Sequence, residues 1–234
     1  MVKVLSLFSG IGAFEKALQN LKIPYELVAY SEIDKYASFA YSVLHNVPET
    51  LNLGDIIKVD ESKLPTDIDL VTFGFPCQPF SNAGLQEGFE DSKGRGNLFF
   101  DALRVIKHCK PKVAIAENVK NLATSDRFRT EFSIIIDSLD EAGYNCYHKV
   151  LDGADYSVAQ HRKRIIIVCI RKDIDSGVFE FPEPVELKKC LYDYLEAEPV
   201  DAKYYVNNEK VQSLIPYLKD KMISGTIRGG GTDR

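Results

Sequence analysis

Short apolar runs typical of strands alternate along this chain with segments whose apolar residues recur at helical spacing. Val2–Phe8 is the first such run, and in Ala13–Leu21 the residues Phe14, Leu18 and Leu21 form the stripe of a helix. Strands and helices that alternate with short connections predict an α/β fold, a doubly wound and mostly parallel sheet with helices on both faces. In such a sheet, ligands bind beyond the carboxyl ends of the strands.

The same two periods predict the remaining elements. Strands are expected at Glu26–Ile33, Leu51–Asp55, Asp69–Phe75, Lys112–Val119, Asn145–Leu151 and Arg164–Arg171, and helices at Tyr36–Leu44, Asn97–Cys109 and Phe132–Ala142. Beyond Pro184 the alternation fails and prolines interrupt the chain. We therefore expect one domain over residues 1–185, and in residues 186–234 the incomplete start of a connection to a further region.

Composition excludes several classes of protein. The 234 residues are 45% hydrophobic and 27% charged, as in globular chains that bury a core. No apolar run approaches the roughly 18 residues that a membrane-spanning helix needs. The five cysteines include no CxxC pair and the four histidines show no metal-ligand spacing, so neither a disulfide framework nor a metal is expected. A reducing, cytoplasmic compartment fits best.

The net charge of −5 is a poor overall match to a polyanion, so contact with a nucleic acid would need a local basic patch. Residues 92–129 hold nine basic and three acidic residues, a net of +6 in an otherwise acidic chain. We expect the patch there.

The first three predicted strands end in residues suited to a small ligand. The glycines of Phe8–Gly12 let a backbone approach a ligand, but Glu15 stands where the dinucleotide fingerprint GxGxxG requires glycine. Glu32 lies 20 residues after Gly12, the usual place for an acid that binds a ribose diol. Asp55 could accept from an exocyclic amine. Together they indicate a pocket for a nucleoside without phosphates, such as adenosylmethionine; a plain tight turn and solvated charges are the alternatives.

The strongest signal follows the fourth predicted strand, where Cys77 stands between two prolines in Gly74–Ser81. A structural cysteine is usually buried on a helix or strand, and prolines on both sides do not favour either element. The thiol is therefore predicted to be a nucleophile. The other four cysteines are expected to be ordinary core or surface residues; they are Cys109, Cys146, Cys169 and Cys190.

Two further polar groups occur at strand ends. Glu117 lies near the end of the strand predicted at Lys112–Val119. Arg162 and Arg164 lead into the last predicted strand, Arg164–Arg171. These side chains could converge on one small polar substrate. A salt-bridged strand end and a solvated basic turn are the alternatives.

In this order, FxGxG, a ribose acid, GDI, GFPCQPFS, ENV and QxRxR are the motifs of DNA (cytosine-5)-methyltransferases, which residues 1–185 resemble. The resemblance implies a Rossmann-like, adenosylmethionine-dependent methyltransferase fold and makes residues 1–185 the cofactor-binding and catalytic domain. It implies methyl transfer from S-adenosyl-L-methionine to C5 of a flipped cytosine in double-stranded DNA, in restriction–modification. S-adenosyl-L-homocysteine is the product, and no metal is needed.

The resemblance also assigns roles to residues. The Cys77 thiolate would add to cytosine C6, a protonated Glu117 would bind N3, Arg164 would hold O2, and Arg162 would orient the site or a phosphate. Cofactor contacts are expected from Phe8, Ser9, Gly10, Ile11, Gly12, Glu32, Ile33, Asp55, Ile56, Gly74, Pro76 and Leu98. Segment 82–96 looks like the family's mobile DNA-closing loop, and DNA contacts are expected from Ser81, Gln86, Ser92, Lys93 and Arg95.

The sequence departs from the family pattern at its end, because no target-recognition region and no late GNxV motif follow. Two expectations arise: a truncated piece of a longer enzyme, or the catalytic half of a split enzyme whose second chain carries recognition. In either case we expect this chain to be inactive or only weakly active on its own. When bound to DNA, it is expected to be nucleoid-associated. The competing functions are a tRNA-methylating relative, disfavoured by GFPCQPFS, and a non-catalytic module that binds adenosylmethionine or DNA.

Overall fold

The structure, a computed structural model, describes residues 1–76, 98–194 and 201 of the chain. The chain divides into two compact units. Met1–Val150 and Arg164–Glu180 form the first, and Leu151–Lys163 belongs to the second together with the chain from Phe181 onwards. Nearly the whole sheet lies in the first unit.

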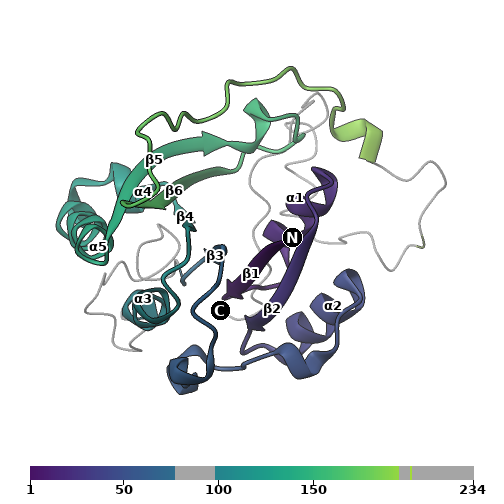
Figure 1. Cartoon of the computed structure of the whole chain (residues 1–234). Helices are drawn as coiled ribbons and strands as arrows, with labels where there is room; N and C mark the ends of the chain where they lie inside the picture. Colours follow the sequence, from purple (N-terminus) through teal and green to yellow (C-terminus); the bar gives the residue numbers. More distant parts are fainter. Residues whose placement is uncertain (77–97, 195–200, 202–234) are drawn as a thin grey trace. The chain divides into compact units, whose positions relative to one another are not determined.

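One sheet of six strands forms the centre of the first unit (Figure 1). Its strands are β1 (Val2–Leu7), β2 (Tyr25–Ser31), β3 (Leu70–Phe73), β4 (Val113–Val119), β5 (Tyr144–Asp152) and β6 (Lys163–Arg171). They are ordered β2-β1-β3-β4-β6-β5. β1 pairs in parallel with β2 and β3, β3 pairs in parallel with β4, and β6 runs antiparallel to β4. The prediction of a mostly parallel sheet is therefore confirmed.

Helices cover both faces of this sheet, as predicted. The described α-helices are α1 (Ala13–Asn20), α2 (Lys35–His45), α3 (Leu98–Cys109), α4 (Asn121–Thr124) and α5 (Arg129–Glu141). α1 and α2 lie on one side of the sheet, and α3 and α5 on the other (Figure 1). No helix in residues 1–76 or 98–194 is long and apolar enough to cross a membrane.

The apolar stripe of α3 shows how the sequence builds these layers. Phe99, Leu103 and Ile106 recur at helical spacing and are buried in the same core cluster as Val71 and Phe73 of β3. Burial of each large side chain contributes about 2–3 kcal/mol. The helix is thereby anchored beside the strand end at which the cavity described below opens.

The strand predicted at Leu51–Asp55 is wrong. Glu49–Leu51 form a single 3-10 turn after Pro48, and Asn52 makes an isolated parallel bridge to Tyr30. The Asn52 side chain bonds to nearby backbone groups, an alternative to a strand ladder that asparagine favours. Gly54 follows with a φ of +71°, which turns the chain away from an extended course.

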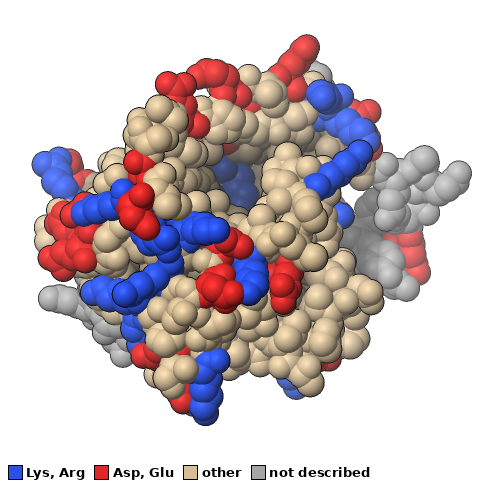
Figure 2. Space-filling model, in the orientation of Figure 1, with Lys and Arg blue, Asp and Glu red and all other residues tan. Residues whose placement is uncertain are grey.

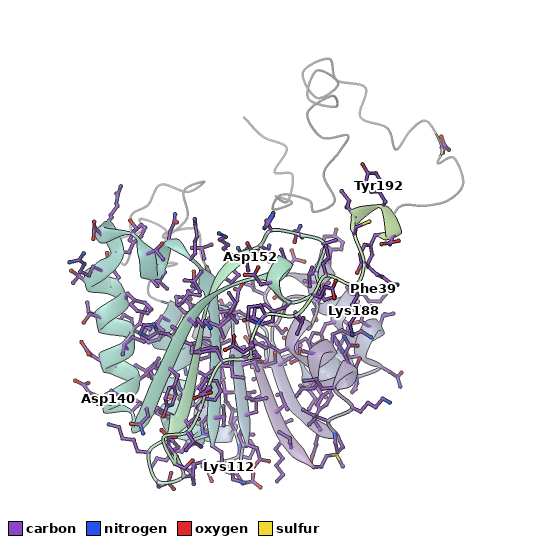
Figure 3. The ribbon with its side chains drawn as sticks, turned by 90° about the horizontal axis from the view of Figure 1, so that it is seen from above. Phe39, Lys112, Asp140, Asp152, Lys188 and Tyr192 are labelled. Carbon is purple, nitrogen blue, oxygen red and sulfur yellow. The ribbon has the colours of Figure 1, made fainter. Side chains whose placement is uncertain are left out.

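The direction of the parallel strands places their functional ends. Lys112 directly precedes β4, and in Figure 3 it lies at the same lower edge as Asp140. Ion pairs tie this edge together, Lys112 to Asp69 at 2.7 Å and Lys3 to Asp67. The carboxyl ends of the parallel strands point to the opposite edge, where an α/β sheet binds its ligand.

Candidate functional site

A cavity of about 340 Å³ opens beyond the carboxyl ends of β1, β2 and β3. It is lined by Phe8, Ser31, Glu32, Ile33, Gly54, Asp55, Ile56, Ile57, Gly74, Pro76 and Leu98. Its volume lies within the range of roughly 300–1,000 Å³ that is usual for small-molecule sites. Its lining combines apolar side chains with two carboxylates, and Ile33 is 75% exposed there. Exposed apolar surface of this kind suits a ligand with a flat apolar part.

Most of the residues predicted to contact a cofactor line this cavity. They are Phe8, Glu32, Ile33, Asp55, Ile56, Gly74, Pro76 and Leu98. Ser9 and Gly10 belong to the adjoining turn, and Ile11 and Gly12 line a separate cavity of about 260 Å³ with Lys16 and His45. Ser31, Gly54 and Ile57 line the main cavity but are not among the predicted residues.

The turn after β1 is tied to the end of β2 by the Glu32 carboxylate. Its Oε2 accepts from the Gly10 N–H and its Oε1 from the Asp34 N–H, both at 2.8 Å. Phe8, the first residue of the turn, has a φ of +53°, a strained conformation for a bulky side chain. Since each carboxylate oxygen can accept two hydrogen bonds, Glu32 is oriented by the backbone and keeps acceptor capacity for a ligand.

The Asn52 amide joins the two acidic turns, a connection that the sequence analysis missed. Its Oδ1 accepts from the N–H groups of Glu32 at 3.0 Å and Gly54 at 2.8 Å. Its Nδ2 donates to the Glu32 carbonyl and to the Ser38 hydroxyl, both at 2.9 Å. All four hydrogen-bonding positions of the amide are used. The turn that carries Asp55 is thereby held against the end of β2.

Glu117 and Arg164 come together at neighbouring ends of β4 and β6. The Arg164 Nε donates to Glu117 Oε1 at 2.6 Å, and both side chains are partly buried. Asn118 is buried beside them and donates from Nδ2 to the Phe75 carbonyl at 3.1 Å. This bond fixes the backbone two residues before position 77. Asn118 belongs to the ENV motif, but no sequence pattern indicates a role for its side chain.

Arg162 belongs to the second unit, where its backbone is held by Asp152. Asp152 Oδ1 accepts from the Arg162 N–H at 2.9 Å, and Oδ2 lies 3.0 Å from His161 Nδ1. Burial raises the pKa of Asp152, but the hydrogen bonds from His161 and from the N–H groups of Ala154 and Arg162 outweigh it, so the pKa is lowered. A buried carboxylate therefore orders the loop that presents Arg162.

Several predicted residues lie outside the described part of the chain. They are Cys77, Ser81, Gln86, Ser92, Lys93 and Arg95. The other cysteines behave as predicted: Cys109 and Cys169 are buried, and Cys146 and Cys190 are partly buried. Burial raises the pKa of the Cys109 thiol to about 11, so it stays protonated and unreactive at neutral pH.

Known proteins resemble this chain in sequence along most of its length. The family model of C-5 cytosine-specific DNA methylases matches residues 2–227. The chain is 39% identical to the orphan methyltransferase M.SPRI of Bacillus phage SPR, over 97% of this chain and 57% of that protein. It is also 39% identical to the type II methyltransferase M.HhaI of Haemophilus parahaemolyticus, over 100% of this chain and 70% of that protein.

Solved structures resemble the fold. The Dnmt2 methyltransferase of S. pombe superposes with a TM-score of 0.69 and 25% identity, over 92% of this chain and 66% of that one. A Spodoptera frugiperda DNMT2 mutant superposes with a TM-score of 0.74 and 24% identity, over 96% of this chain and 69% of that one. Among eight of the curated relatives that it matches, the chain spans between 51% and 70% of their length. Because the family model covers nearly every residue, this protein belongs to the C-5 cytosine-specific DNA methylase family.

Proposed function

We propose that this chain carries the cofactor pocket and catalytic groups of an enzyme that methylates C5 of cytosine in double-stranded DNA, with S-adenosylmethionine as the methyl donor. One observation carries the proposal: in a member of this family, the cavity at the strand ends presents the Glu32 and Asp55 carboxylates together with apolar walls. The proposal includes DNA as partner because the matching family is that of the C-5 cytosine-specific DNA methylases.

The polar groups in the cavity fit an adenosine moiety. Glu32 has acceptor capacity for ribose hydroxyls, and Asp55 can accept from the exocyclic amine. Phe8, Ile33 and Ile56 offer apolar surface to a purine ring. The two carboxylates also favour a ligand that carries a positive charge. Bound there, adenosylmethionine would supply an electrophilic methyl group.

Cytosine C5 is a weak nucleophile, and a thiolate overcomes this by adding to C6. Cys77 directly follows Pro76, which lines the cavity, and the preceding backbone is held by Asn118. The new sulfur–carbon bond places negative charge on N3, O2 and C5 of the ring, so that C5 can take the methyl group. Loss of the C5 proton to a base and cleavage of the sulfur–carbon bond then restore the aromatic ring and the thiolate.

The charge that develops on the ring needs partners. We assign Glu117, in its protonated form, as the donor to N3 and Arg164 as the donor to O2, because their contact brings a carboxyl group and a guanidinium together at the neighbouring ends of β4 and β6. Arg162 would bind a phosphate or orient the site from the loop that Asp152 orders. C6 is inaccessible in stacked DNA, so the target base must leave the helix at a cost of a few kcal/mol.

Duplex DNA with 5-fluorocytosine in place of the target base tests the covalent step, because fluorine blocks loss of the C5 substituent. With S-adenosylmethionine present, the intact wild-type assembly, in which this chain is completed by its recognition region, is expected to form an adduct that survives a denaturing gel. The same assembly with Cys77→Ala is expected to form none. Cys190→Ser, which alters a partly buried cysteine elsewhere in the chain, is the matched control and should form the adduct. An adduct on Cys77→Ala, or a wild-type protein that labels only a tRNA competitor, would overturn the proposal.

A further inference from the structure

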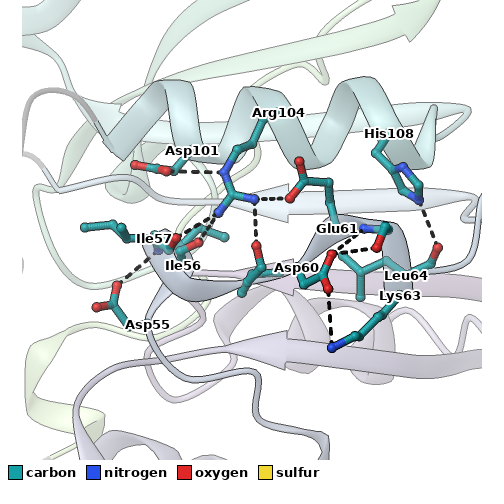
Figure 4. Close-up of polar contacts among 12 residues, drawn as sticks. Asp55, Ile56, Ile57, Asp60, Glu61, Lys63, Leu64, Asp101, Arg104 and His108 are labelled. Carbon is teal, nitrogen blue, oxygen red and sulfur yellow. Dashed lines mark hydrogen bonds and ion pairs between the residues drawn. The ribbon is translucent and has the colours of Figure 1, made fainter.

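Arg104 of α3 directs both Nη atoms of its guanidinium group to the segment that follows Gly54 (Figure 4). Nη1 donates to the Val59 carbonyl at 2.7 Å, and Nη2 donates to the carbonyls of Ile56 and of Ile57. Nη1 also bonds to a Glu61 carboxylate oxygen, and Nε donates to Asp101. Arginine has five N–H donors in a rigid fork, and here five acceptors meet them.

The surroundings of Arg104 make these bonds strong. Its side chain is only 29% exposed, and the carboxylates of Glu61 and Asp101 balance its charge. Three of the five acceptors are backbone carbonyls at or beside the single-turn 3-10 helix Ile56–Lys58. A helix of one turn satisfies few of its own carbonyls, so it depends on outside donors. Arg104 supplies them from another element.

The segment that Arg104 holds is one wall of the cavity. Asp55, Ile56 and Ile57 line the cavity, and Arg104 does not. Asp55 also begins the 3-10 turn, because its Oδ1 accepts from the Ile57 N–H at 3.1 Å. A displacement of the turn would therefore move both the apolar wall and the carboxylate. On the other side, Asn52 fixes the N–H of Gly54, so the turn is held at both ends.

We propose that Arg104 is a positioning residue that presets the Asp55–Ile57 wall and thereby sets the affinity of the pocket for the adenosine part of the cofactor. The inference rests on the proposed function. A preset wall spares the ligand the cost of ordering the turn, which is how preorganisation raises affinity. Lysine cannot replace Arg104, because an ammonium group has three donors and no planar fork.

Calorimetric titration of the complete protein with S-adenosylmethionine tests this inference. We expect Arg104→Lys to raise the dissociation constant on the order of 10-fold and Arg104→Met somewhat more, as loss of outer-shell support does at other sites. Arg129→Met is the matched control, since Arg129 pairs with Asp126 at the same i, i+3 spacing but is 80% exposed. It should leave the dissociation constant unchanged.

Kinetic measurements separate positioning from a general loss of structure. For Arg104→Lys, the KM for S-adenosylmethionine should rise, while the KM for DNA and kcat at saturating cofactor stay within about twofold of wild type. In an Asp55→Asn background, Arg104→Lys should lose most of its effect, because both residues act on the same turn. Arg104→Lys retains the charge and guards against a variant that does not fold.

The outcomes distinguish this inference from the proposed function. A wild-type protein that does not bind S-adenosylmethionine would contradict the proposed function. Wild-type binding that Arg104→Lys leaves unchanged would overturn only the role of Arg104. If Arg104→Lys lowered kcat and raised both KM values together, in proportion to a lowered melting temperature, Arg104 would be a merely structural residue. That result would also overturn the role of Arg104.

Discussion

Gly12 at the start of α1 has two reasons to lack a side chain. Its φ is +85°, and an added Cβ would lie 2.1 Å from His45 Nε2. That nitrogen lies 2.9 Å from the Ile11 carbonyl oxygen, so the ring is not free to move away. Gly12→Ala is expected to lower the free energy of unfolding by about 2–4 kcal/mol, from left-handed strain and overpacking together. Urea unfolding followed by circular dichroism measures this.

Gly10→Ala is the matched control for that prediction. Gly10 has a φ of +55°, but an added Cβ would meet no atom within 4 Å. Its variant should lose only the backbone part, about 1–2 kcal/mol. Equal losses at the two positions would show that the His45 contact does not constrain Gly12.

At the scale of single residues, the sequence predicted what a short motif can encode. Glu32 and Asp55 were placed in a pocket because each follows a predicted strand. Both line the cavity, although the strand predicted before Asp55 is a turn. The strained φ of Phe8 has no sequence signal, because it arises from the turn that the Glu32 carboxylate holds. Glu15 entered the sequence prediction only as a departure from the dinucleotide fingerprint. Its side chain is 1% exposed and lies beside Tyr41, whose pKa is raised by burial and by this carboxylate.

Among the elements, the loop between β5 and β6 depends on one carboxylate. The Asp152 side chain is 8% exposed and bonds to His161 and to two backbone N–H groups, and Lys163 Nζ lies 4.0 Å away. Because its pKa is lowered on folding, it stabilises the fold above its unfolded-state pKa of about 3.9, and this stabilisation is lost as the pH falls further. Asp152→Asn should therefore cost about 1–2 kcal/mol at pH 7, and the difference should shrink below about pH 4.

Urea unfolding of the wild type and of Asp152→Asn at pH 7, 5 and 3.5 checks this dependence. Asp155→Asn serves as the control, since Asp155 is exposed in the same loop. Its unfolding free energy should follow that of the wild type at every pH. A difference between wild type and Asp152→Asn that stays constant down to pH 3.5 would contradict the role given to the Asp152 charge.

Hydrophobic periodicity predicts the helices and strands correctly wherever one face of the element packs into the core. The stripe of α3 and the apolar run of β6 were both predicted, because their buried faces contribute to one core. The strand prediction at Leu51–Asp55 failed because two leucines in alternation resemble a strand, while the Asn52 amide and Gly54 shape a turn. Asn52 and Arg104 were missed for a common reason: most of their partners lie 14 to 48 residues away, and no local pattern encodes such pairs.

For the whole molecule, the described residues cover only part of the segment 92–129 in which a basic patch is predicted, and some of the positive charges there are paired. Figure 2 shows Lys and Arg side chains interspersed with Asp and Glu on the face in view. Among the described residues of that segment, Arg104, Lys112 and Arg129 each pair with a carboxylate. Such pairs are structural and leave less positive charge for a polyanion. The DNA contacts predicted at Lys93 and Arg95 lie outside the described residues.

The central claim is methyl transfer to cytosine C5 by a pocket and a thiol at the strand ends of this sheet. Its most direct measurement supplies S-adenosylmethionine with a deuterated methyl group and a mixed-sequence DNA duplex, then hydrolyses the DNA to nucleosides for mass spectrometry. The account predicts the label in 5-methyl-2′-deoxycytidine, and none when Cys77 is alanine. Label on the exocyclic amine of cytosine or adenine, or 5-methylcytosine made without Cys77, would contradict it.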